Sequence, residues 1–307
     1  MSNPSVIDTK MHGLEGITAA FVVRAERTAL VETGPLSSLP ALLQGLAALG
    51  VDEIDDIVVT HIHLDHAGAA GALARRWPRA TVHVHEVGAP HLADPSKLWA
   101  SAARIYGDEM KSLWGGIEPV PPERIRALAD GDVVDLGGRT LTAFDTPGHA
   151  YHHHAYLDSD SGTLFTGDAL GVRLPNVGVL RPATPPPEFN LERAIASIER
   201  IAGLGAARLT LTHFGPGDEG KHALGVSELC DAAIAVLRRW ADWVVAARAE
   251  TTDLDDAALL VAERARAALE GTVAPEDLER LEHTTSYRMN TWGYMRYFDK
   301  AASSSDR

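Results

Sequence analysis

The order of the elements predicted from the sequence places this chain in the α/β (α+β) class, with sheets covered by helices and a helical region at the C-terminal end. Three observations support this class. β-Branched and apolar runs alternate with helical patterns over about the first 85 residues, strand signals return in hairpins between residues 125 and 165, and the pattern is helical from about residue 221 onward. Such an order is typical of sheets that pack helices against their faces.

The first half of the chain alternates between strands and helices. Valine and leucine are frequent in the strand segments, and Gly34-Pro35 ends the second of them. Leucines recur at helical spacing between residues 37 and 48. In chain order, the predicted elements are strands at 17–24 and 28–33, a helix at 37–48, a strand at 57–60, a helix at about 68–76 and a strand at 81–85.

A helical insertion at about 88–123 interrupts this alternation. Prolines flank it, and its middle carries Trp99, Tyr106 and Trp114. These aromatic residues are expected either to pack the insertion itself or to form an apolar wall of a pocket that lies under the insertion and the loop at 171–189.

Strand signals resume after the insertion, and Gly137-Gly138 predicts a hairpin turn. The predicted elements are strands at 125–129, 132–136, 139–145, 155–157 and 163–165, a helix at about 190–203 and a closing strand at 208–212. We therefore predict a main domain over residues 1–220, which includes the insertion, and a C-terminal helical region over residues 221–307.

The C-terminal region carries two apolar features that must be covered. Residues 287–298 are dense in aromatic side chains, methionine and arginine, which is the composition of contact surfaces. The preceding helix has an apolar stripe. Burial against the main domain, a homodimer interface and a wall of the substrate pocket are the three outcomes left open. The stripe consists of Ala233, Val236, Leu237, Trp240, Val244 and Ala247.

The charge balance limits the classes of partner. The chain has 42 acidic and 28 basic residues and a formal net charge of -14, which argues against nucleic acids and anionic membranes as partners. One cysteine, Cys230, allows no intrachain disulfide. The first residues show neither a basic nor an apolar run, so a cytoplasmic protein is expected.

The central motif follows the short strand at 57–60 and places three imidazoles and a carboxylate within six residues, at His61, His63, Asp65 and His66. These side chains suit zinc, iron or manganese. In an extended stretch His61 and His63 point to the same side, because side chains alternate along a strand. Asp65 and His66 lie where the chain turns into a helix, so they can face a neighbouring second ion.

Three later residues of metal-ligand type each stand just past a predicted strand. They are His149, Asp168 and His213, and each has a glycine within two residues. Strand ends form a stiff frame, which metal geometry requires. The sequence therefore predicts a metal site at one edge of the sheets.

These motifs, in this order, resemble the signature of the metallo-β-lactamase superfamily over about residues 15–217. The resemblance implies an αββα sandwich with a dinuclear site at one edge of two facing sheets. Glu32-Thr33-Gly34 stands where the family often has Asp-Thr-Gly, a departure expected to be structural. It further implies a first metal held by His61, His63 and His149, a second held by Asp65, His66 and His213, and Asp168 as the bridge between them.

The function that the resemblance implies is hydrolysis by a metal-bound hydroxide of a small ester, thioester or lactone. Two divalent ions are expected, with zinc favoured and iron or manganese open, and Asp65 is expected to pass a proton to the leaving group. One alternative is a phosphodiesterase of the same fold. Another, from a different class, is a metal-binding protein that is not a hydrolase, such as a mononuclear iron dioxygenase or a sensor.

The remaining histidines are expected to have lesser roles. One of His152, His153 and His154 is expected to support a ligand or contact the substrate. His83 and His85 share one face of a strand and are expected to pack. The histidines expected only at the surface are His12, His91, His222 and His283.

Overall fold

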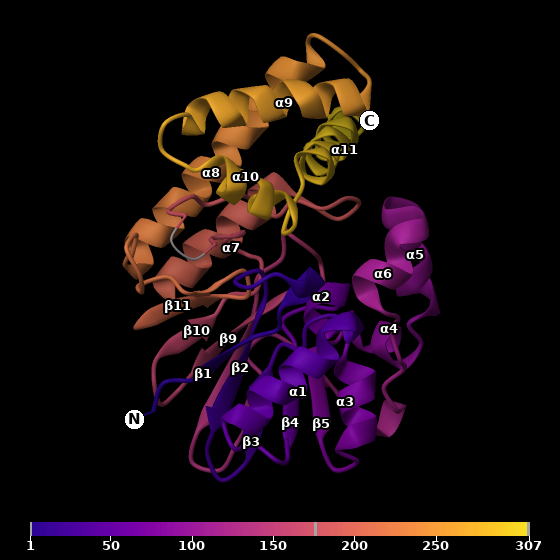
Figure 1. Cartoon of the computed structure of the whole chain (residues 1–307), viewed down its shortest axis with the longest axis vertical. Helices are drawn as coiled ribbons and strands as arrows, with labels where there is room; N and C mark the ends of the chain where they lie inside the picture. Colours follow the sequence, from indigo (N-terminus) through magenta and orange to yellow (C-terminus); the bar gives the residue numbers. More distant parts are fainter. Residues whose placement is uncertain (1, 175–176, 306–307) are drawn as a thin grey trace.

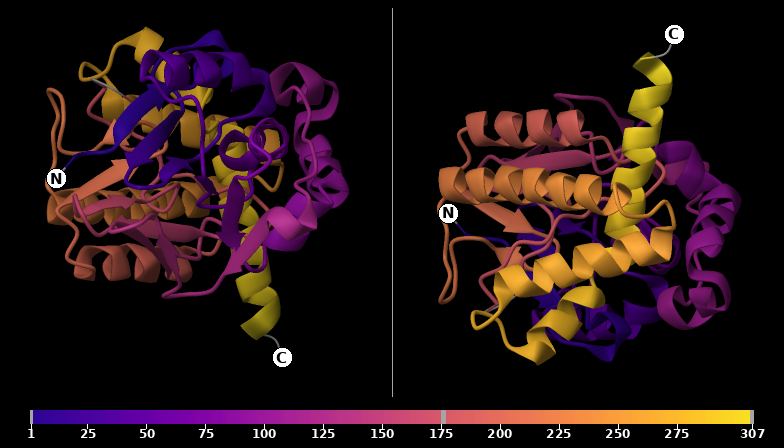
Figure 2. Two further views of the ribbon diagram at one scale, coloured as in Figure 1. Left: turned by 90° about the horizontal axis from the view of Figure 1, so that it is seen from below. Right: turned by 90° about the horizontal axis from the view of Figure 1, so that it is seen from above.

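Two six-stranded sheets face each other in the computed structural model, which describes residues 2–174 and 177–305, and helices cover both outer faces (Figures 1 and 2). This arrangement confirms the predicted αββα sandwich. The first sheet runs in the order β1 (Ser5–Asp8), β2 (Ala19–Arg24), β3 (Thr28–Val31), β4 (Asp56–Val58), β5 (Thr81–His85) and β6 (Ile125–Leu128). Its first three strands are antiparallel, and β3 to β6 are parallel.

The second sheet is antiparallel except where β10 pairs with β11. It runs in the order β12 (Gly215–Pro216), β11 (Arg208–Leu211), β10 (Thr163–Phe165), β9 (His154–Asp158), β8 (Thr140–Asp145) and β7 (Val133–Asp135). The prediction lacked the edge strands β1 and β12. Only Ile7 of β1 is buried, and β12 has two residues, so neither shows the alternation that identifies a strand.

Helices on the side of the first sheet come from the first half of the chain. They are α1 (Leu39–Ala48), α2 (Leu64–Ala67), α3 (Ala70–Arg76), α4 (Ala89–Ala93), α5 (Ser96–Tyr106) and α6 (Met110–Trp114), with short 3-10 helices at Met11–Gly13, Leu36–Ser38, Gly107–Glu109 and Pro122–Arg124. Helices α4 to α6 form the predicted insertion. On the side of the second sheet lie α7 (Leu191–Gly203) and α8 (Val226–Arg248), and α9 (Leu254–Leu269) and α11 (Tyr287–Ser305) pack on α8, whereas α10 (Pro275–Glu282) packs at the edge of the sandwich with Met11 and Trp114.

Alternation along the strands separates the apolar layers. In β2, Phe21 and Val23 point between the two sheets, whereas Ala20 and Val22 point toward α1 and α3. In β10, Phe165 joins the layer between the sheets and Leu164 faces α7 and α8. Because side chains alternate between the two faces of a strand, each strand contributes to the apolar layer on both of its faces.

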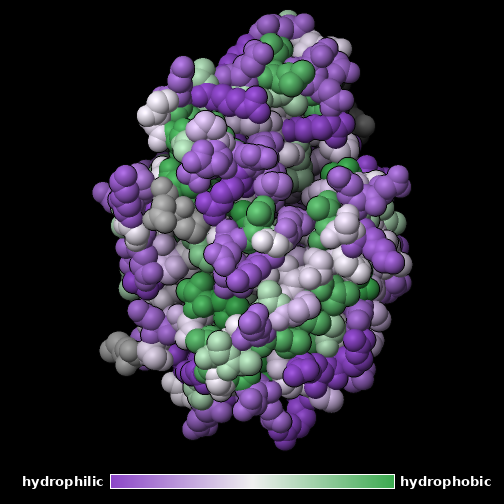
Figure 3. Space-filling view, in the orientation of Figure 1, coloured by the Kyte–Doolittle hydropathy of each residue, from purple (hydrophilic) through white to green (hydrophobic). Residues whose placement is uncertain are grey.

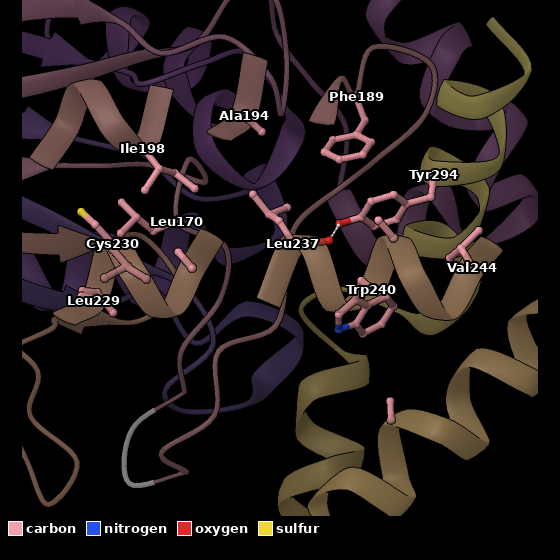
Figure 4. Close-up of a cluster of buried hydrophobic side chains, with 14 of the residues drawn as sticks. Leu170, Phe189, Ala194, Ile198, Leu229, Cys230, Leu237, Trp240, Val244 and Tyr294 are labelled. Atoms are coloured by element: carbon pink, nitrogen blue, oxygen red, sulfur yellow. Dashed lines mark hydrogen bonds between the residues drawn. The ribbon is translucent and has the colours of Figure 1, made fainter. Parts of the chain in front are cut away.

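The C-terminal helices continue the apolar layer over the second sheet (Figure 4). Five of the six predicted stripe residues of α8 are buried, and Val236 is partly buried. Tyr294 of α11 is fully buried, and its hydroxyl donates to the Leu237 carbonyl oxygen at 2.8 Å. The expected burial of this region against the main domain is confirmed, and a homodimer through it stays a prediction.

The start of α11 is fixed to the loop between β10 and α7. The Asn290 side chain accepts from the Thr184 amide at 2.9 Å and donates to the Pro182 carbonyl oxygen at 2.8 Å. Gly293 lies one helical turn further on, against the backbone of Thr184. Because a Cβ at residue 293 would overlap the Thr184 carbonyl oxygen, this close approach requires glycine.

The surface is mostly polar. Figure 3 shows polar side chains over most of one face, with apolar ones in smaller areas. Exposed large apolar residues on the C-terminal helices, such as Val245 and Leu259, are ordinary for a protein surface. Among the described residues, none of the helices has the length and apolar character needed to cross a bilayer.

Gly293→Ala is expected to lower the free energy of unfolding by about 1–3 kcal/mol, because the added methyl group forces α11 away from Thr184. Thermal or urea denaturation measures this. Gly203→Ala is the matched control, since that helical glycine has no atom within 4 Å of an added Cβ, and it should change stability by no more than about 1 kcal/mol, in the favourable direction. Equal effects of the two substitutions would contradict the packing described.

Candidate metal centre

The seven residues predicted to bind metal lie on loops that follow four strands, and the fold brings them together. Helix α2 begins at Leu64, so the chain changes direction between His63 and Asp65. This turn separates the two halves of the central motif, as the sequence predicted. His61, His63, Asp65 and His66 follow β4, His149 follows β8, Asp168 follows β10 and His213 follows β11.

One group consists of His61, His63 and His149. Nδ1 of His63 lies 3.0 Å from Nε2 of His61 and 2.8 Å from Nε2 of His149. The three nitrogens lie within 4.8 Å of one another. Three imidazole nitrogens that converge in this way form a donor set of the kind that holds zinc.

The other group consists of Asp65, His66 and His213. Oδ2 of Asp65 lies 3.7 Å from Nε2 of His66 and 3.3 Å from Nε2 of His213. Asp168 stands between the groups: its Oδ2 lies 3.6 Å from Nε2 of His149, and its Oδ1 lies 3.3 Å from Nε2 of His66. One carboxylate therefore presents an oxygen to each side.

Hydrogen bonds at the far nitrogens fix how these rings point. Nδ1 of His149 donates to the Ala183 carbonyl oxygen at 2.9 Å, and Nδ1 of His213 donates to the Ile17 carbonyl oxygen at 2.8 Å. A carbonyl oxygen can only accept, so the proton sits on Nδ1 and the lone pair of Nε2 faces the centre.

A buried carboxylate, Glu32, ties together the segments that carry these ligands. Its Oε1 lies 3.0 Å from Nδ1 of His66 and accepts from the hydroxyls of Thr60 at 2.6 Å and Thr212 at 3.0 Å. The hydroxyl of Thr60 in turn lies 3.0 Å from Nδ1 of His61. Glu32 was expected to be structural. Its contacts show that it positions the segments that carry His61, His66 and His213, which the sequence signalled only by an acidic residue before Thr33-Gly34.

His153 has the supporting position predicted for one residue of 152–154. Its Nε2 accepts from the Asp168 amide at 3.1 Å, and its Nδ1 lies 2.7 Å from the Thr146 hydroxyl. Gly167, with φ of 51°, packs against this ring: a Cβ there would lie 2.5 Å from Nε2 of His153. The backbone of Asp168 is thus held by a ring that a larger residue 167 would displace.

A further group of His85, Asp145 and His154 lies nearby, but its hydrogen bonds argue against a metal. The Val87 amide donates to Nδ1 of His85 at 3.0 Å, so the proton of the neutral ring is on Nε2, which faces Oδ1 of Asp145 at 3.4 Å. Nε2 of His154 approaches the same oxygen at 2.8 Å. This group therefore joins the two sheets by hydrogen bonds. His83 is buried as expected, and its Nε2 lies 2.8 Å from Oδ1 of Asp56.

Burial and neighbouring charges act differently on the two groups. Burial and the neighbouring imidazoles hold the pKa of His61 and of His63 well below the usual range. Burial also lowers the pKa of His66, but Asp168, Glu32 and Asp65 raise it more, to well above its usual range. Burial raises the pKa of Asp168, yet His66 and His213 outweigh it and hold that pKa well below normal. The centre thus combines neutral imidazoles at His61 and His63 with an ionised carboxylate at Asp168 and an imidazole at His66 that attracts positive charge.

The donor atoms fit a bound cation. Nε2 of His66 and Oδ1 of Asp168 are buried, and apart from their own approach at 3.3 Å neither makes a hydrogen bond to a described residue. Buried polar atoms normally have a partner, so an unpartnered pair in one spot requires an explanation. A divalent ion between an imidazole nitrogen and a carboxylate oxygen would satisfy both.

A cavity of about 560 Å³ opens over the centre and reaches His63, Asp65, His149 and Asp168. Tyr106 and Trp114 line it as expected, whereas Trp99 does not and packs the insertion. The other wall comes from α10, α11 and the loop between them, so the C-terminal segment lines the cavity, and its contact with a substrate stays a prediction. Its residues in that wall are Glu282, His283, Thr284, Thr285, Ser286, Arg288, Met289 and Trp292.

The expectations for the surface histidines and for the loop at 171–189 are borne out only in part. His12, His91 and His283 were expected only at the surface, but they line the cavity, because their segments meet there only in the folded chain. His222 is exposed as expected. Within the loop at 171–189, residues 183 and 185–188 line the cavity, and residues 175 and 176 lie outside the described residues.

The sequence is similar to proteins of several activities. It is 35% identical over 140 residues to the metallo-beta-lactamase fold-containing protein ST1585 of Sulfurisphaera tokodaii, covering 44% of this chain and 51% of that protein. A coenzyme F420H(2) oxidase of Methanothermobacter marburgensis is 30% identical over 53% of this chain and 37% of its own length. A hydroxyacylglutathione hydrolase of Aeromonas hydrophila is 31% identical over 49% of this chain and 45% of its own length. The chain spans about half the length of these relatives or less.

The solved structures extend the similarity of fold to nearly the whole chain. The crystal structure of ST1585 from Sulfolobus tokodaii superimposes with a TM-score of 0.69 and 22% identity, covering 96% of this chain and 99% of that one. The sequence profile described as the Metallo-beta-lactamase superfamily matches residues 12–213, which include all seven converging residues. This chain therefore belongs to the metallo-beta-lactamase superfamily.

Proposed function

We propose that this chain is a dinuclear metal-dependent hydrolase of a small ester, thioester or lactone. The observation that carries the proposal is the position of Asp168, whose two carboxylate oxygens face two separate groups of three donors. The proposed ligands are His61, His63 and His149 for one ion, Asp65, His66 and His213 for the other, and Asp168 for both. Zinc suits this set of nitrogen and oxygen donors, and iron and manganese are the alternatives.

Two bound cations would supply a water of lowered pKa and an electrophile for the substrate carbonyl oxygen. The chain's own residues would perform the remaining tasks. Asp65 borders the cavity, and its Oδ atoms would take the proton that the attacking water loses and pass it on toward the leaving group. Glu32 and His153 would hold the ligands still while charge moves. The apolar side chains of α5, α6 and α11 would bind the organic part of the substrate and limit the entry of water.

The cavity favours a substrate with little charge. Lys97 and Arg288 are the lysine and arginine that line it among the described residues, and Arg288 is paired with Asp255. Glu109, Glu188 and Glu282 also line it. A polyanionic substrate would meet few cations there besides the metals, so a neutral carboxylic ester or lactone suits the walls better than a phosphodiester.

A redox function is the second candidate, because a relative of similar identity is named an oxidase. The metal discriminates between the two functions. Two zinc ions would support hydrolysis, since zinc has no redox chemistry in proteins. Iron that cycles between oxidation states would support the oxidase.

Elemental analysis of the metal-replete protein is expected to find about two ions per chain. Asp168→Ala should lose metal and activity together, because it removes an oxygen from each group. His222→Ala, an exposed histidine outside the centre, should change neither. One ion per chain in the replete wild type, or full turnover in Asp168→Ala, would exclude the dinuclear hydrolase.

Glu32→Gln is expected to weaken metal binding by about 10- to 100-fold, because it removes the charge that orients His66 and the acceptor shared by Thr60 and Thr212. Competition with a chromogenic chelator measures the affinity. Glu53→Gln, an exposed carboxylate paired with Arg79, is the matched control and should bind metal like the wild type. Unchanged metal affinity in Glu32→Gln would contradict the positioning role assigned to Glu32.

A screen of the purified metal-replete protein against esters, thioesters, lactones and phosphodiesters tests the substrate class. Carboxylic substrates are expected to give kcat/KM values at least about 100-fold above those of phosphodiesters, as the few cations in the walls imply. The opposite order would favour the phosphodiesterase.

A further inference from the structure

One wall of the cavity carries two polar rings that have no part in the proposed metal binding. His12 and Tyr106 line that wall. Burial lowers the pKa of His12, which makes its protonated ring a stronger acid, and the charge of Asp65 partly offsets this shift. Each ring packs against Trp114, with centroids 5.9 Å apart for His12 and 5.1 Å apart for Tyr106. Both rings lie close enough to Asp65 for its charge to act on them.

The segment that carries His12 is fixed on both sides. Met11 and Ile17 are buried in one apolar cluster with Trp114, and the Ile17 carbonyl oxygen accepts from Nδ1 of His213. His12 itself has a left-handed backbone, with φ of 57°, which turns its side chain out of the segment and into the cavity. The imidazole makes no hydrogen bond to the part of the chain that the structure describes, so both ring nitrogens are available to a substrate.

Three other polar groups that line the cavity are less suited to donate a proton. Burial and Asp65 raise the pKa of Tyr106, and its hydroxyl contacts the Met289 sulfur at 3.7 Å. Nδ1 of His152 lies 3.5 Å from the Ile62 amide, and its Nε2 lies 3.7 Å from Glu188. His283 is exposed at the mouth. His12 combines free nitrogens with a fixed position near Asp65.

We propose that His12 is a catalytic residue that protonates the leaving atom of the substrate, a role that rests on the proposed hydrolase function. The oxygen of water forms a bond to the acyl carbon and gives its proton to Asp65. The bond from the acyl carbon to the leaving oxygen or sulfur breaks, its electron pair goes to that atom, and the atom takes a proton from the His12 imidazolium. Asp65 then returns its proton to His12, leaving the carboxylic acid and the alcohol or thiol as products.

The test compares esters of one short carboxylic acid that differ in the leaving group: 4-nitrophenyl, phenyl and ethyl. His12→Asn suits a left-handed backbone and removes the imidazole. It should lower kcat/KM at least about 100-fold for the ethyl ester and less than about 3-fold for the 4-nitrophenyl ester, because only a strongly basic leaving oxygen needs the proton. His12→Gly should show the same pattern, and added imidazole should restore its activity on the ethyl ester.

Lys10→Asn is the matched control, because Lys10 has a left-handed backbone in the same turn but pairs with Glu15 at the surface. It should hydrolyse all three esters like the wild type. Metal content and thermal midpoint, measured on every variant, should stay at wild-type values. A loss independent of the leaving group, no loss, or loss of metal in both His12 variants would overturn the assignment while leaving the hydrolase proposal intact. If the metal-replete wild type hydrolyses none of the esters, thioesters or lactones, the hydrolase proposal fails and the assignment fails with it.

Discussion

The candidate site depends on one buried carboxylate, that of Glu32, and on the three donors that surround it. Glu32 follows β3 in the first sheet, Thr60 and His66 lie just beyond β4, and Thr212 follows β11 in the second sheet. A carboxyl group removed from water is costly unless hydrogen bonds replace its hydration, so the burial of Glu32 requires these segments to meet at this point. The edge where the two sheets converge is fixed by the same contacts that orient His66.

The second feature of the structure is the way the C-terminal helices complete the cavity. Helix α11 is buried at Tyr294, joined to the loop between β10 and α7 through Asn290, and packed against Thr184 at Gly293. The same helix presents Met289 and Trp292 to the cavity. Stability and the cavity wall therefore share one element, so we expect substitutions on the inner face of α11 to affect folding and substitutions on its cavity face to affect the proposed substrate. A shared superfamily fold gains its own specificity from such additions.

The two groups of donor residues in the centre differ in the direction in which the pKa values of their histidines are shifted. His61 and His63 are surrounded by other imidazoles, which disfavour protonation, whereas His66 and His213 face carboxylates, which favour positive charge. A cation beside His66 would take the place of the proton that Asp168 and Asp65 attract. The proposed second ion thus lies where the negative charge is concentrated, and the cavity wall with His12 and Tyr106 lies on that side.

The sequence by itself determined the fold class, the order of nearly all strands and helices, and the seven residues that converge, because each of these follows from local patterns. Alternation and helical spacing identify elements, and His61 to His66 form one contiguous motif. The exceptions were the edge strands β1 and β12, which are too short to show a pattern. Only the tertiary structure decided the contacts of Glu32 and His153, the position of His12 in the cavity wall and the placement of α11 over the cavity. These depend on contacts between residues far apart in the chain, such as Glu32 with Thr212, and no local periodicity encodes which distant segments will meet.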